Sequence, residues 1–233
     1  MKILSLLLIA TMILVAPSVV SAGGPVSLSV SATVSDGTDL GTHEVLECTG
    51  YSYVKTGDPF VQCTRKGAAA VLNFGTLSTR LQKTDGSDDG GAGCFYASKF
   101  FIVYLYPDAW GGSGYELKQT AASFPSAIAN SVVMTPVYSA SDKYDPAKPE
   151  TQGALNVAPY SGEVLGVAKL AVNGGSILKA KRPRIVRAEY GMPPNPKTGE
   201  PKPTSDSAWK PVPLDTTAAT YTSGTITISI TPW

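Results

Sequence analysis

The C-terminal stretch Ala219–Trp233 constrains the fold more than any other part of the chain. Within it, Ile226, Ile228 and Ile230 alternate strictly with threonine and serine. Alternation with period two in β-branched residues predicts a strand that is buried on one face only. Because such a face needs a second layer to cover it, the stretch predicts a sheet packed on another sheet, as in a β-sandwich.

A second amphipathic stretch lies near the N-terminus and predicts a first strand over Val26–Val34. Glycine and proline are abundant, with 23 and 18 residues, and no long run of helix-forming residues is present. An all-β fold with long Gly/Pro-rich loops is therefore expected. The apolar residues that alternate with serine and threonine in the first strand are Val26, Leu28, Val30, Ala32 and Val34.

The first 22 residues have the form of a secretory signal peptide. Lys2 precedes an apolar run, Ile3–Val15, and the small residues of Val20–Ala22 fit a cleavage site. Cleavage after Ala22 would leave one domain, residues 23–233, in an oxidising compartment. The alternative is a retained anchor, although the run is short for a membrane span, and no later segment is apolar enough to cross as a helix. Basic and acidic residues nearly balance in the mature chain, so we expect no binding to nucleic acid.

Three cysteines remain after cleavage, which suggests one disulfide and one free thiol. Cys48 and Cys63 each lie in a β-like run, and the turn-forming segment Thr56–Pro59 separates them. Folding back at that turn would place the two nearly opposite each other, so we favour this pair. A linkage of Cys94 to either residue stays open.

Further strands and loops follow from local composition. We expect a hairpin turn at Asn173–Gly175 and a solvated, flexible connection over the Asp/Gly-rich segment Thr84–Gly93. Gly191–Pro213, with seven prolines, should form a long loop within the same domain. The most apolar strand, Phe95–Tyr106, should be central in its sheet. The other expected strands are Val45–Val54, Phe60–Thr64, Ala69–Leu77, Tyr115–Thr120, Val132–Tyr138, Val164–Val172, Ser176–Lys181 and Arg184–Tyr190.

Three features together resemble the spore-coat-U/Csu-type pilin subunits. They are the amphipathic N-terminal strand, the segment Leu72–Thr76 (Leu-Asn-Phe-Gly-Thr) after a cysteine, and the closing segment Tyr221–Ile228. The excursion at 140–160 and the proline-rich loop are longer than this family's pattern. The resemblance implies a secreted, immunoglobulin-like antiparallel β-sandwich that a periplasmic chaperone and an usher assemble into surface fibres.

The same resemblance implies that each subunit lacks one strand, which the N-terminal extension of the next subunit supplies. Residues 23–34 are then a possible donor strand, whose alternating side chains Val26, Leu28, Val30, Ala32 and Val34 would fill pockets of a neighbouring pilin-like subunit. The alternative is that Val26–Val34 is the first strand of its own domain. The expected location is the periplasm in transit and then the cell surface or an extracellular fibre.

The residue sets of common catalytic and metal sites are missing, so we expect no enzyme, no cofactor and no metal. His43 is the only histidine, which excludes sites built on several histidines. Asp85, Asp88 and Asp89 lack the spacing of a calcium loop. A glycosidase built on two carboxylates is the remaining enzymatic alternative.

One basic cluster and three tryptophans could contact ligands. For the cluster, Lys179, Lys181, Arg182, Arg184 and Arg187, we expect a solvated sheet edge, where charge deters unwanted pairing. Tryptophans stack on sugars when exposed but more often pack over the ends of a core. The alternative function is thus a secreted β-sandwich that binds carbohydrate or protein without polymerising. It would display Trp110 or the proline-rich loop to its ligand; the other two tryptophans are Trp209 and Trp233.

Overall fold

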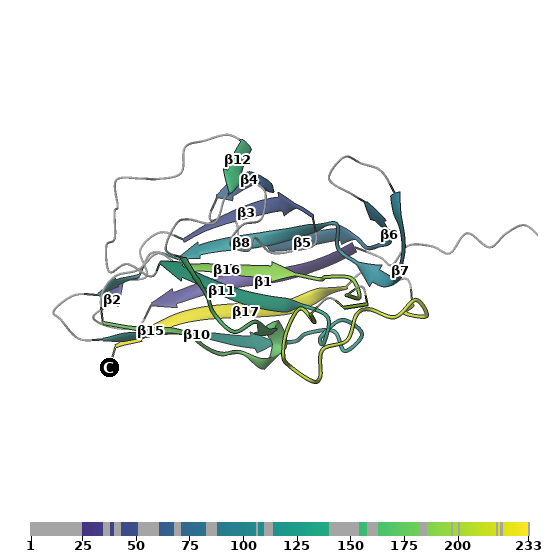
Figure 1. The fold of residues 1–233 in the computed structure, drawn as a ribbon. Coiled ribbons are helices and arrows are strands. Elements are labelled where there is room, and N and C mark those ends of the chain that lie inside the picture. Colours follow the sequence, from purple (N-terminus) through teal and green to yellow (C-terminus); the bar gives the residue numbers. More distant parts are fainter. Residues whose placement is uncertain are drawn as a thin grey trace, which may run out of the picture.

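Two sheets assembled from strands far apart in the sequence make up most of the computed structural model (Figure 1). The predicted signal peptide, residues 1–22, lies outside the described residues. The structure describes residues 25–34, 38–39, 43–50, 61–67, 71–82, 88–105, 107–109, 114–139, 154–157, 163–181, 186–196, 198–199, 201–217, 219 and 221–232.

The five-stranded sheet contains both amphipathic stretches that the sequence singled out. Its neighbouring strands are antiparallel, except that the first and last strands of the fold run parallel to each other. In spatial order the strands are β15 (Gly175–Ala180), β10 (Tyr115–Ala122), β17 (Tyr221–Pro232), β1 (Pro25–Val34) and β5 (Val71–Thr76).

The eight-stranded sheet is antiparallel throughout. One of its edges consists of two short strands, β13 and β14, which both pair with β11. In spatial order the strands are β12 (Ala154–Val157), β4 (Val61–Gly67), β3 (His43–Thr49), β8 (Lys99–Leu105), β16 (Val186–Gly191), β11 (Val133–Ser139) and β13 (Glu163–Leu165), with β14 (Lys169–Leu170) further along β11.

The main core combines residues of both sheets, as a sandwich requires. Ile226, Ile228 and Ile230 of β17 are completely buried in it, which confirms the predicted facing of the closing strand. β8 is central in its sheet, as the sequence predicted for Phe95–Tyr106, although Phe95 and Tyr96 belong to β7. Its odd-numbered residues from Phe101 to Leu105 join this core, and Phe100, Ile102 and Tyr104 join a second cluster on the opposite face.

The prediction of a solvated loop over Thr84–Gly93 is wrong for its second half. Residues 88–93 belong to β7 (Asp88–Tyr96), which pairs with β6 (Ser78–Gln82) in a two-stranded sheet at one end of the sandwich (Figure 1). Gly90 and Gly93 have φ of 97° and 66°, conformations that glycine adopts at no steric cost, and the ladder contains register shifts. The side chains of Leu81, Ala92, Cys94 and Tyr96 form a small buried cluster there. Glycine therefore shapes an irregular ladder here rather than a flexible loop.

The predicted hairpin at Asn173–Gly175 is instead a crossover between the two sheets. β13 and β14, which precede it, pair with β11, whereas β15, which follows it, pairs with β10. A 3₁₀ turn, η1 (Ala171–Asn173), makes the connection. Gly174 is required because its φ is 61° and a Cβ there would lie 2.7 Å from the Gln119 carbonyl oxygen. A turn signal between two strands does not specify that they pair with each other.

The described part of the proline-rich loop packs against the sandwich. Trp209 is 6% exposed and contacts Val133 and Leu170, so this tryptophan covers the core and offers no stacking surface. Backbone hydrogen bonds attach the loop at several points, including Phe95 N–H to Val212 O at 2.8 Å. Trp110 and Trp233 lie outside the described residues. The remaining short pair is β2 (Thr38–Asp39) with β9 (Asp108–Ala109).

Candidate strand-exchange interface

β1 fills a gap between β17 and β5, which we call the β1 seat (Figure 1). It runs parallel to β17 on one side and antiparallel to β5 on the other, so both of its backbone edges are hydrogen-bonded within its own chain. Four of the five candidate exchange residues lie opposite β17 in continuous register: Leu28 opposite Gly224, Val30 opposite Ile226, Ala32 opposite Ile228, and Val34 opposite Ile230.

The β5 side of the seat is shorter and less regular. Leu28 lies opposite Leu72, and the fifth candidate, Val26, lies opposite Gly75. The register shifts between Val26 and Ser27, where Gly75 has a φ of 69°. The ladder with β17 is regular from Leu28 to Val34 and shifts between Val26 and Leu28, whereas the shorter ladder with β5 shifts between Val26 and Ser27.

The walls of the seat are apolar and belong to the main core. Leu72 and Phe74 of β5 are at most 1% exposed, and Phe74 packs edge-to-face on Phe101 with ring centroids 5.2 Å apart. Ile226 and Ile228 line the β17 side. The sequence identified Leu72–Thr76 by its resemblance to a family, but nothing in the sequence indicated that this segment would form the second wall. In this structure the candidate donor segment completes its own sheet.

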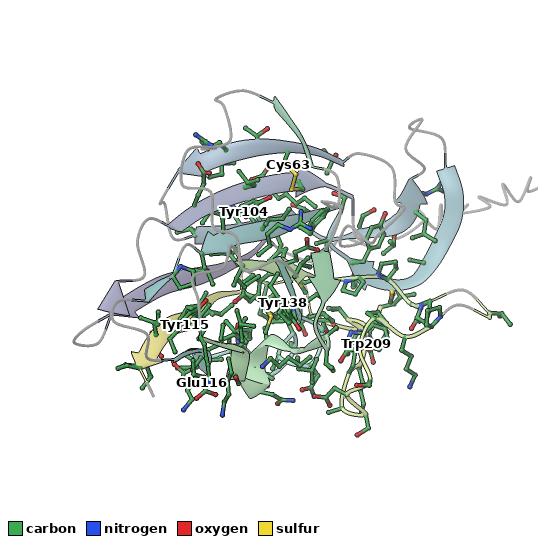
Figure 2. All side chains as sticks on the ribbon, turned by 60° about the vertical axis from the view of Figure 1, so that its left-hand side comes forward. Cys63, Tyr104, Tyr115, Glu116, Tyr138 and Trp209 are labelled. Atoms are coloured by element: carbon green, nitrogen blue, oxygen red, sulfur yellow. A yellow bond between two sulfur atoms is a disulfide. The ribbon has the colours of Figure 1, made fainter. Side chains whose placement is uncertain are left out.

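The favoured cysteine pair forms a disulfide that joins β3 to β4. Cys48 and Cys63 lie directly opposite each other with Cα atoms 4.0 Å apart, and Figure 2 shows the sulfur–sulfur bond at Cys63. Both residues are buried in the cluster on the far face of the eight-stranded sheet. The turn proposed for Thr56–Pro59 lies outside the described residues.

Cys94 is the third cysteine and is buried as a free thiol on β7. The Asn195 N–H donates a hydrogen bond to its Sγ at 3.4 Å. Burial raises the pKa of the Cys94 thiol and outweighs the opposite effect of that hydrogen bond. A protonated, enclosed thiol is a poor nucleophile, so Cys94 does not have the environment of a reactive cysteine.

We expect unreduced peptide mapping to recover Cys48 linked to Cys63. The folded protein should react with a thiol reagent such as DTNB only after denaturation, when one equivalent of Cys94 becomes accessible. Replacing Cys48 and Cys63 together by alanine should lower stability by roughly 3 kcal/mol, because they close a loop with a sequence separation of 15. A Cys94-linked peptide, or fast labelling of the native protein, would contradict this assignment.

A buried polar network links the two sheets. The Tyr190 hydroxyl of β16 donates to Gln119 Oε1 of β10 at 2.5 Å, and Gln119 Nε2 donates to the Ala171 carbonyl at 2.7 Å. Burial raises the pKa of Tyr190 far above its usual range, so this hydroxyl stays a neutral donor. The network is satisfied internally and fixes the spacing of the sheets. The only sequence signal for it was a glutamine among alternating residues.

The expectation of a solvated basic cluster is wrong for Arg187. This residue lies on β16, a central strand, and is 1% exposed beside Glu189 on the same face, with Arg187 Nε 3.8 Å from Glu189 Oε1. Lys179 does lie on an edge strand, β15, and is exposed, 3.7 Å from Glu116. Lys181 is also exposed, while Arg182 and Arg184 lie outside the described residues.

The described residues contain no group of three or more histidine, cysteine, aspartate or glutamate side chains that could hold a metal ion. Asp88 and Asp89 are in β7, His43 begins β3, and Asp85 lies outside the described residues. Within the part of the chain that the structure describes, no helix has the length and apolar character to span a membrane. Comparisons with protein-family models, curated proteins and solved structures gave no match.

Proposed function

We propose that the protein is an exported structural subunit of a surface fibre or pilus and that copies assemble by exchanging β1. The single observation that carries the proposal is the β1 seat. There an N-terminal strand lies between β17 and β5, and among the described strands of the sheet it is the one that joins these two. A strand from a second copy has the same sequence and so can adopt the same register, which makes exchange a low-cost route to assembly. Repeated head-to-tail exchange would give a fibre, and reciprocal exchange would give a closed dimer.

The chemistry of the seat supports strand addition. Main-chain hydrogen bonds on both sides provide affinity that is independent of side chains, and the alternating apolar residues of β1 provide the specificity. An empty seat would expose the edges of β17 and β5 together with Ile228 and Phe74, a surface prone to aggregation. We therefore propose that a periplasmic chaperone protects the seat during transfer and that an usher orders the exchange.

Export is part of the same proposal. A signal peptide over residues 1–22 would direct the chain to the periplasm, where the Cys48–Cys63 disulfide forms and persists. The neighbouring pilin-like subunits would then be the partners at the cell surface. Detection of Gly23 as the N-terminus of the exported protein would support this part of the proposal, and an intact Met1 would contradict it.

Removal of residues 23–34 tests the exchange. We expect the truncated protein to have a lower melting temperature, and a synthetic peptide of Val26–Val34 to bind it and restore the lost stability. A peptide with Leu28→Asp and Val30→Asp should fail, whereas one with Ser27→Asp and Ser29→Asp should retain most of the effect. The peptide titration, followed by calorimetry and thermal melting, also remains informative if the truncated protein alone is unfolded.

The intact chain provides the decisive observation. After partial denaturation at high concentration and return to native buffer, size-exclusion chromatography with light scattering should show dimers or longer species, which the Val26–Val34 peptide suppresses. The truncated protein should not form them. An intact protein that remains monomeric through repeated cycles, while the peptide still rescues the truncated form, would mean that β1 is only an internal strand.

A further inference from the structure

A short segment bulges from the edge of the eight-stranded sheet between β13 and β14. Both strands pair with β11, and residues 166–168 between them leave the ladder. Gly166 anchors this segment because its N–H donates to the Pro136 carbonyl at 2.7 Å, and a Cβ there would lie 2.5 Å from Pro136 Cγ. Val167, at the tip, is 76% exposed. The Thr204 hydroxyl donates to the Ala168 carbonyl at 2.6 Å and ties the segment to the proline-rich loop.

Two hollows flank this bulge and share Gly166 and Val167 as a common wall. The smaller, of about 260 Å³, extends toward the proline-rich loop, and the larger, of about 490 Å³, extends toward β15. Cavities of a few hundred Å³ suit small molecules or short oligomers. Figure 2 shows Tyr138, which lines the larger hollow, and Trp209, which is on the proline-rich loop.

The charged side chains that line the hollows have one sign, although Lys179 also lies 3.7 Å from Glu116. Among the described residues that line them, Lys169, Lys179 and Lys202 are basic and none is acidic. Lys169 is partly buried, and its Nζ donates to the Ser176 carbonyl at 2.6 Å. Burial lowers the pKa of Lys169, so a bound carboxylate would replace part of the solvation that its ammonium has lost.

The smaller hollow also contains a polar group that lacks a partner. Thr135 is 2% exposed, and its hydroxyl makes no hydrogen bond with any described residue. A buried hydroxyl without a partner destabilises the fold, and a hydrogen bond to a ligand hydroxyl or carboxylate would offset that cost. Thr204 and Ser205 line the same hollow. The site therefore combines ammonium groups, hydroxyl groups and the ring of Tyr138 on the far side of the bulge.

A peptide strand is a poor fit because the adjacent sheet edge is blocked. β15 is the edge strand of the five-stranded sheet, but Lys169 already occupies the Ser176 carbonyl. The β15 ladder is also shifted at Ile177, where both Ile177 and Leu178 are buried. A bulge and a lysine are the usual devices that prevent a strand from adding to an edge. Recognition here must use side chains and not the main chain.

We propose that the two hollows bind an acidic oligosaccharide, with one uronic-acid carboxylate at Lys169 and another at Lys202. The sugar rings would lie across Val167, with an apolar ring face on Tyr138 and hydroxyl groups at Thr135 and Ser205. Such a site would let the protein contact a carboxylated polysaccharide of a cell surface or matrix. It does not require exchange of β1, so a monomer should bind.

Calorimetric titration of the full-length monomer with trigalacturonate tests the site. We expect saturable binding, with a Kd at least tenfold weaker for Lys169→Met and for Lys202→Met. Lys210→Met is the matched control, because Lys210 is an exposed lysine of the same loop that lines neither hollow, and its Kd should stay within twofold. Lys202 is exposed, so Lys202→Met remains informative even if Lys169→Met lowers the stability of the fold.

Two further ligands, one neutral and one that is not a saccharide, test whether binding needs both the carboxylates and the sugar rings. Maltotriose, which lacks carboxylates, should bind at least tenfold more weakly than trigalacturonate. A triglutamate peptide has the charge without the sugar rings and should also be weak. Equal affinity for triglutamate would show nonspecific attraction to lysines, and unchanged affinity of both lysine variants would place any binding elsewhere.

Discussion

Replacing Ile228 by aspartate is expected to remove a large share of the protein's stability. Ile228 is completely buried in the main core, in the middle of β17. The variant would bury a carboxylate without a partner, a change of about 4 kcal/mol or more. A domain of this type has only about 5–15 kcal/mol of stability in total. Urea denaturation followed by circular dichroism would measure the change.

Thr227→Asp is the matched control for the facing of β17. Thr227 is the adjacent residue of the same strand, and its side chain is half-buried on the opposite face. The same charge there should cost about 1 kcal/mol, because it can reach water. A similar loss of stability in the two variants would show that the β17 facing is wrong, whatever the absolute size of the effect.

Replacing Arg187 by methionine is expected to be nearly as damaging. Arg187 and Glu189 are both at most 2% exposed and lie on the same face of β16. Without the guanidinium, the buried Glu189 carboxylate would lose this counter-ion, and breaking a buried ion pair typically costs about 3–5 kcal/mol. The double variant Arg187→Met with Glu189→Leu removes both charges and should recover most of the loss. Denaturant titration of four proteins, the unmodified chain, the two single variants and the double variant, would give the coupling between the two positions.

Lys179→Met provides the exposed comparison for this pair. Lys179 lies 3.7 Å from Glu116 on the outer side of β15 and β10, and an exposed ion pair is usually worth less than 1 kcal/mol. Its loss should therefore shift stability only slightly. If the double variant were as unstable as Arg187→Met alone, the damage would come from lost packing and not from the broken ion pair.

Periodicity gave the sequence analysis its most accurate results. Strict alternation placed the isoleucines of β17 in the core, and the continuous apolar run around Phe101 correctly indicated a central strand. Both inferences depend only on which faces of one strand are buried. The all-β class and the two-layer arrangement followed because exposed apolar faces require a cover.

The errors occurred where the burial of a residue depends on other segments. Arg187 looked solvent-exposed within a run of basic residues, yet β16 lies between β8 and β11, and both of its faces are buried. Residues 88–93 looked like a loop, yet β6 supplies a partner that local composition cannot reveal. The candidate exchange strand was found by its alternation, but its two neighbours, β17 and β5, are determined by long-range pairing.

The parallel pairing of β1 with β17 also has a consequence for the time course of folding. Val26 pairs with Tyr221, so the two partners in this ladder emerge from the ribosome at opposite ends of synthesis. β10 and β5 can form early, but the sheet cannot close until β17 has been made. Such non-local closure slows folding and keeps apolar edges open in the nascent chain. Slow closure of this kind would favour export of an unfolded chain, as the proposed route to the periplasm requires.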